Sequence, residues 1–353
     1  MNTSGSSTAR SAMLILAAFV IIVAGMKVAS PLIVPILLSL FIATISAPPL
    51  LWLKEKGIPT FLAMLLVVGF ILGAGILVVT LVGASLTDFR GQLPVYEQRL
   101  DGLFQNVTAL AAKYEVSLNF SDIASVINPA SVATGVGRLV NEIGGLIANA
   151  FLIFIVVVFM LFEVSSLPGK LKAMTSRPAD SIERLANFKS SLQRYLVIKT
   201  ATSLATALMV WILLKALGVD FAVLWALLAF FLNFVPNIGS VIAAIPAVMI
   251  ALLQTDVLTA VWVAVGYLVI NSLVGTVIEP RIAGRHLGLS PLIVFLSLVF
   301  WGYILGPVGM FLSVPLTMVV RLVAESSDDT RWISILLSER VHESDSGMND
   351  GQQ

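Results

Sequence analysis

Long apolar segments recur along the whole chain, and no other feature limits its possible folds as strongly. A helix needs about 18–20 apolar residues to cross the roughly 30 Å of hydrocarbon in a bilayer. Of the 353 residues, 58% are hydrophobic and 12% are charged, against about 45–50% and 25% in soluble domains. A protein of this composition has too much apolar surface to be surrounded by water. The sequence therefore predicts an all-α polytopic membrane protein with about six full transmembrane helices, at 11–29, 31–48, 59–83, 146–163, 200–217 and 257–278.

Two further apolar segments, 221–253 and 289–323, are too long for a single crossing. Each exceeds 30 residues, which is roughly 50 Å of helix, and tilt does not absorb that excess. Each also carries proline and glycine near its middle, in Pro236-Asn237-Ile238-Gly239 and Gly306-Pro307-Val308-Gly309. The pattern predicts two broken, re-entrant helical hairpins of opposed direction, an inverted repeat. Separate spans joined by tight turns are the alternative.

The basic residues predict the orientation of the chain. Segment 164–199 has seven Lys or Arg residues against two acids, and short loops of that composition stay in the cytoplasm. We therefore expect a multi-pass protein of the bacterial inner membrane with both termini cytoplasmic. The expected layout is a disordered cytoplasmic tail (1–10), a transmembrane scaffold (11–83), a helical periplasmic segment (84–145), transmembrane helices with the basic cytoplasmic loop 164–199 (146–220), a transport unit (221–323) and a cytoplasmic tail (324–353).

The periplasmic segment is too polar to span the membrane but carries an apolar stripe at helical spacing. We expect one helix to begin at Pro94 and a second near Ser121, broken at Asn128-Pro129. The stripe needs a partner surface, either a helix of the same chain or the same helix of a neighbouring copy. Its members are Leu93, Tyr96, Leu100, Leu103, Val107, Leu110 and Tyr114.

Paired interruptions of membrane helices predict a transport site near the middle of the bilayer. A broken helix leaves backbone groups unpaired, and amide or hydroxyl side chains there can bind either those groups or a ligand. A neutral polyol fits such donors and acceptors better than an ion does. The candidate substrate-binding residues are Asn233, Pro236, Asn237, Gly239, Ser240, Asn271, Gly306, Pro307 and Gly309.

Charged residues at the ends of apolar segments are candidates for a gate or for proton coupling. Glu279 follows the segment 257–278 and can either pair with Arg281 or Arg285 or bind a coupling proton. Arg281 is a candidate as well, and Glu163 ends the segment 146–163. Charges at membrane depth are costly, so such residues are often functional. The alternative is that they are ordinary carboxylates at the membrane interface.

The sequence lacks the signatures of enzymes. It has no cysteine and two histidines, and it contains no zinc-protease helix, nucleophile elbow or phosphate-binding loop. A net charge of +1 gives no reason to expect nucleic acid as a partner. We expect a carrier driven by an ion gradient of protons or sodium, with no cofactor and no metal. A cation/proton antiporter and a non-transporting membrane scaffold are the alternatives.

Several ordered motifs resemble those of the autoinducer-2 exporter (AI-2E) family, from the first apolar segment to about residue 340. The resemblance implies export of autoinducer-2, a small furanone-type polyol used in quorum sensing, and a homo-oligomer, a pentamer. Some similar proteins act as sodium(lithium)/proton antiporters, so the resemblance does not fix the substrate. The motifs are Leu93-Pro94, Phe159-Met160-Leu161-Phe162-Glu163, 194–200, 233–240, 279–285, 301–310 and Ser313-Val314-Pro315-Leu316.

Overall fold

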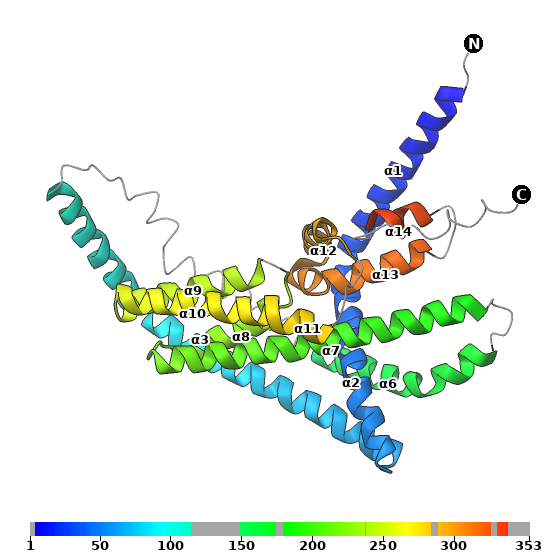
Figure 1. Ribbon diagram of the computed structural model, residues 1–353, viewed down its shortest axis with the longest axis horizontal. Helices are drawn as coiled ribbons and strands as arrows, with labels where there is room; N and C mark the ends of the chain where they lie inside the picture. The colour runs from blue at the N-terminus through cyan, green and yellow to red at the C-terminus, as the bar shows by residue number, and fades with distance from the viewer. Residues whose placement is uncertain are drawn as a thin grey trace, which may run out of the picture. The chain divides into compact units, whose positions relative to one another are not determined.

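The computed structural model describes residues 4–113, 149–173, 179–236, 238–283, 289–325 and 330–337. All elements within these ranges are helices (Figure 1), which confirms the predicted all-α membrane architecture. They are α1 (Ser4–Val28), α2 (Ser30–Glu55), α3 (Thr60–Lys113), α6 (Ala150–Ala173), α7 (Ala179–Ala216), α8 (Ala222–Leu232), α9 (Gly239–Gln254), α10 (Val257–Ser272), the π-helix η1 (Leu273–Ile278), α11 (Glu279–Ala283), α12 (Pro291–Phe311), α13 (Ser313–Glu325) and α14 (Arg331–Leu337).

Five helical segments of the described residues are long and apolar enough to cross a membrane. The predicted spans 11–29 and 146–163 correspond to α1 (25 residues) and α6 (24 residues), whose apolar parts among the described residues are Met13–Val28 and Ala150–Glu163. Pro291–Phe311 also reaches this length, but it includes residues on both sides of the break at Gly306. The five segments are Ser30–Glu55, Thr60–Leu100, Ala186–Ala216, Val257–Ile278 and Pro291–Phe311.

The chain forms two compact units, which we describe separately. The larger unit comprises residues 35–168 and 196–282, and the smaller comprises 1–34, 169–195 and 283–353. In the larger unit, α8, α9 and α10 pack side by side (Figure 1). Its main apolar core includes the fully buried side chains Trp225, Ile250 and Val263.

Three local predictions about helix boundaries are corrected by the structure. Residues 4–10, expected to be disordered, are the first turns of α1. The loop 164–199 is largely helical, since α6 reaches Ala173 and α7 begins at Ala179. Pro94 does not start a helix but lies inside α3, which is continuous from Thr60 to Lys113. A proline removes one backbone hydrogen bond, and a helix packed on both sides of that position can tolerate the loss.

The described part of the apolar stripe on α3 packs within its own chain. Tyr96 and Leu100 are buried in the core of the larger unit, and Leu93 packs against it. α3 contacts both α8 and α9 there. The side chains of Leu103, Val107 and Leu110 are not described, and Tyr114, Ser121 and Asn128-Pro129 lie outside the described residues.

The first long apolar segment is a helix–turn–helix hairpin, as predicted. α8 has 11 residues and α9 has 16, so each arm is shorter than the roughly 20 residues that a crossing requires. Gly239 lies so close to the end of α8 that an added Cβ atom would be 1.8 Å from the Leu232 carbonyl oxygen. We call α8, the turn 233–238 and α9 the first hairpin.

Polar contacts close the base of the first hairpin and attach it to α3. The backbone N–H of Asp220 donates to Gln254 Oε1 (2.7 Å), which joins the two ends of the hairpin. Tyr96 Oη donates to Asp220 Oδ2 (3.2 Å). Arg99 Nη1 donates to the carbonyl oxygens of Leu253 (3.1 Å) and Gln254 (2.9 Å), which satisfies acceptors that the end of α9 leaves unpaired.

The second long apolar segment, in the smaller unit, is also a broken helix that turns back. Gly306 interrupts α12 with φ 67° and ψ −155°, a conformation that favours glycine. A Cβ atom on Gly309 would be 2.0 Å from the Trp301 carbonyl oxygen. α12 and α13 pack together, and Trp301 Nε1 donates to Thr317 Oγ1 (3.1 Å). We call α12 and α13 the second hairpin. That either hairpin is re-entrant remains a prediction.

Candidate functional site

A polar stripe on α7 is the centre of the candidate site. Its four residues recur at the three- and four-residue spacing that places side chains on one face of a helix. All are buried, Ser203 completely, within the candidate span Ala186–Ala216. The Thr206 hydroxyl donates to the Thr202 carbonyl (3.0 Å) and the Thr202 hydroxyl to the Lys199 carbonyl (3.1 Å). The polar stripe of α7 consists of Lys199, Thr202, Ser203 and Thr206.

The turn of the first hairpin is bound to this stripe. Asn233 Nδ2 donates to Ser203 Oγ at 2.9 Å. The backbone of Asn233 stays helical at the end of α8, and its N–H donates to the Ala229 carbonyl. The side-chain amide therefore joins two helices and does not repair the helix break, which was the alternative interpretation of this residue.

An ion pair lies at one end of the stripe. Lys199 Nζ is 3.0 Å from both carboxylate oxygens of Glu279, and the two side chains are 10% and 25% exposed. Of the two partners considered for Glu279, Arg281 is exposed, and the ion pair that the described residues show is with Lys199. Arg285 lies outside the described residues. Lys199 is the last residue of the basic segment 164–199, and the structure shows that it is buried on α7.

A π-helix places Glu279 for this contact. η1 joins α10 to α11, and the backbone N–H of Glu279 donates to the Val274 carbonyl, five residues earlier. A π-turn holds more residues than an α-turn, so it rotates the residues that follow relative to the face of α10. Such segments are rare and are frequent at functional sites. Val274 is buried in the core of the larger unit, which fixes η1 in place.

The remaining candidates of the larger unit surround this centre less directly. Pro236 lies in the turn of the first hairpin, and its carbonyl accepts from the Ile238 N–H (2.7 Å). Gly239 is buried and Ser240 is half-buried at the start of α9. Asn271 is half-buried on α10, Glu163 is exposed on α6, and Asn237 lies outside the described residues.

Gly306, Pro307 and Gly309 form the break of the second hairpin, in the smaller unit. Gly309 is buried and Pro307 is exposed. The structure thus brings Asn233 and Glu279 to the same face of α7, where they contact Ser203 and Lys199. A site that combines these residues with the second hairpin remains a prediction.

Sequence reasoning missed the whole stripe of α7. The signal was present, since a lysine, two threonines and a serine recur with helical spacing at the start of the predicted span 200–217.

Buried hydroxyl and amide groups are neutral donors and acceptors, which suits recognition of a hydroxyl-bearing solute. The ion pair adds one positive and one negative charge at the end of the stripe. Within the described ranges, no three His, Cys, Asp or Glu side chains cluster as metal ligands would.

Comparison with known proteins gives consistent matches over nearly the whole chain. Residues 16–327 match the family model described as AI-2E family transporter. The AI-2 transport protein TqsA of Escherichia coli (strain K12) is 40% identical over 326 residues, which cover 92% of this chain and 95% of the relative. A "Putative transport protein" of Haemophilus influenzae (strain ATCC 51907 / DSM 11121 / KW20 / Rd) is 39% identical over 330 residues, with 92% and 95% covered. The matched range includes every helix of the candidate site.

Proposed function

Because the chain belongs to the AI-2E family of membrane transporters, we propose that it exports autoinducer-2, or a similar small polar solute, across the bacterial inner membrane. The relative named AI-2 transport protein supports this substrate, since it is similar over 92% of the chain. The expected driving force is a gradient of protons or sodium ions.

The hydrogen bond between Asn233 and Ser203 carries the proposal. It ties the turn of the first hairpin to the polar stripe of α7 at 2.9 Å, and the stripe is buried. A polyol that reaches the stripe would replace this bond with bonds to its own hydroxyl groups, so the hairpin would separate from α7 without leaving polar groups unpaired. Pro236, Asn237, Gly239, Ser240 and Asn271 would complete the site in this unit, and Gly306, Pro307 and Gly309 would act from the second hairpin.

The ion pair is proposed to couple transport to an ion gradient. Removing the charge of one partner from a buried pair leaves the other charge without compensation, which is costly. Protonation of Glu279 would therefore favour a state in which Lys199 reaches water. Arg281 and Glu163, which are both exposed, would contribute to the gate.

Efflux from proteoliposomes loaded with autoinducer-2 tests the proposal directly. We expect efflux above that of protein-free vesicles, and an imposed proton gradient should change its rate. Asn233→Ala and Ser203→Ala should each lower the efflux. Thr200→Val is the matched control, because among the described residues this neighbouring hydroxyl on α7 binds only the Leu196 carbonyl (2.8 Å). Wild-type efflux in both site variants would remove the stripe from the solute site.

A cation/proton antiporter is the second candidate, and the Lys199–Glu279 pair is the observation that favours it. In the same vesicles, addition of sodium or lithium would then change the internal pH, and Glu279→Gln would abolish that change. Exchange of sodium for protons without any autoinducer-2 efflux would establish this alternative over the exporter.

We also propose a homo-oligomer, a pentamer, with both termini cytoplasmic. The resemblance to the AI-2E family supports assembly. Mass photometry of the purified chain in detergent measures the number of copies directly. A monomer under these conditions would contradict the oligomer and leave the transport proposal unaffected.

A further inference from the structure

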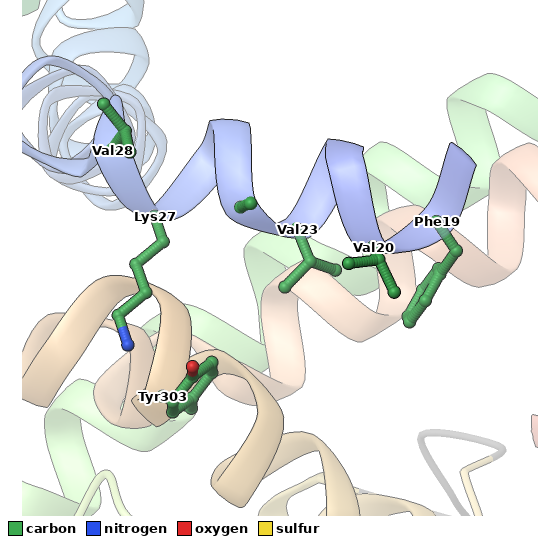
Figure 2. Close-up of a pocket in the computed structure, with 7 residues that line it drawn as sticks. Phe19, Val20, Val23, Lys27, Val28 and Tyr303 are labelled. Carbon is green, nitrogen blue, oxygen red and sulfur yellow. The ribbon is translucent and has the colours of Figure 1, made fainter. Parts of the chain in front are cut away.

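A groove between α1 and α12, in the smaller unit, has the form of a lipid site. Its volume is about 320 Å³. One wall is the apolar face of α1 from Phe19 to Val28, and Lys27 and Tyr303 lie together at the end near Val28 (Figure 2). The Lys27 ammonium lies over the Tyr303 ring, 3.5 Å from its centroid.

The groove faces the surroundings of the protein. Phe19 stacks on Phe300 of α12 with ring centroids 6.2 Å apart, but the rest of this α1 face is open, with Val20 57% and Val28 83% exposed. In a membrane transporter, an open apolar groove on a helix of this kind is filled by acyl chains, because water does not reach it favourably.

The charge of Lys27 distinguishes this groove from two other apolar grooves of the described residues, lined by Trp301 and by Pro49 among others, which hold no charged residue. Lys27 is the sole charged residue between Ser11 and Leu53, and in the described part of the chain no carboxylate forms an ion pair with it. It is next to the last residue of the apolar helix Met13–Val28. In a bilayer, a lysine at the end of such a helix would extend its ammonium toward the headgroups. The anion available at that depth is a lipid phosphate.

We propose that this groove binds one anionic phospholipid. An acyl chain lies along α1 between Phe19 and Val28, and the phosphate binds the Lys27 ammonium. The Tyr303 ring holds the ammonium at the mouth of the groove through its negative face. The proposal does not depend on the transported solute.

Native mass spectrometry of the full chain in detergent tests the site with phosphatidylglycerol and phosphatidylcholine as probes. We expect the wild type to bind one phosphatidylglycerol about fivefold more tightly than phosphatidylcholine, the effect of one lysine near an anionic headgroup. Lys27→Gln should abolish this preference. Lys56→Gln is the matched control, because Lys56 also lies over an aromatic ring, Trp52, at 3.8 Å but does not line the groove.

A second variant tests the acyl-chain part of the site. Ala24→Trp fills the groove without changing its charge, and it should weaken binding of both lipids. An unchanged preference in Lys27→Gln, or an equal loss in Lys56→Gln, would overturn the proposal. Competition by soluble glycerol phosphate would also overturn it, because the site would then bind phosphate without a chain.

Discussion

The two hairpins turn in similar ways but are held by different contacts. In both, a glycine packs against a carbonyl oxygen of the first arm, Gly239 on Leu232 and Gly309 on Trp301. The turn of the first hairpin is then bound to another helix, through Asn233 and Ser203. The arms of the second hairpin are bound to each other, through Trp301 and Thr317. The glycine contact is common to both turns. The polar contact differs, because in the first hairpin it reaches another helix at the candidate site and in the second it stays within the hairpin.

The largest effect should come from Gly239→Ala and Gly309→Ala. An added Cβ atom would overlap a backbone oxygen at 1.8 or 2.0 Å, and a backbone atom cannot move aside unless the hairpin opens. We expect each variant to lose about 3 kcal/mol or more of stability, measured by thermal unfolding in detergent. Gly73→Ala on α3 is the control, because nothing lies within 4 Å of its added Cβ atom. Tolerance of either alanine would show that the two turns are not equivalent.

Removal of one charge from the Lys199–Glu279 pair should have the next largest effect. Glu279→Gln leaves a buried ammonium without its counter-charge, and because the Glu279 side chain is 25% exposed we expect a loss of about 2 kcal/mol. Glu325→Gln is the comparison, since its pair with Arg321 is more exposed and lies within α13. Such a pair contributes about 0.5 kcal/mol or less. Equal losses in chemical unfolding of the two variants would contradict a buried, site-forming pair.

A double-mutant cycle on Asn233 and Ser203 should reveal a smaller coupling. Asn233→Ala and Ser203→Ala should each cost about 1–1.5 kcal/mol, and the double variant should cost about 1 kcal/mol less than their sum. Urea unfolding in detergent measures the free energies. A coupling of zero would mean that the amide serves only the turn of the first hairpin, as in the alternative drawn from the sequence.

The sequence predicted the parts of the fold that depend on local length and composition. Segment length together with proline and glycine located both hairpin breaks, at 233–238 and near Gly306. The same reasoning failed at Pro94, where packing of α3 outweighs the local effect of a proline. It also failed at Lys199, because the partner that makes its burial tolerable is Glu279, 80 residues away. A pairing between distant helices has no local signal, whereas the helical spacing of the polar stripe of α7 was visible in the sequence.

The smallest effect should come from Trp301→Phe in the second hairpin. The variant removes the donor to Thr317, but the Thr317 hydroxyl still donates to the Ser313 carbonyl (2.8 Å), so no buried polar group loses all its partners. We expect a loss of about 1 kcal/mol or less in thermal unfolding and an unchanged KM for autoinducer-2 efflux. Asn233→Ala should instead raise KM, because its bond lies on the proposed solute site. If Trp301→Phe raised KM as much as Asn233→Ala does, the internal contact of the second hairpin would belong to the solute site as well, and the distinction between the two hairpins would fail.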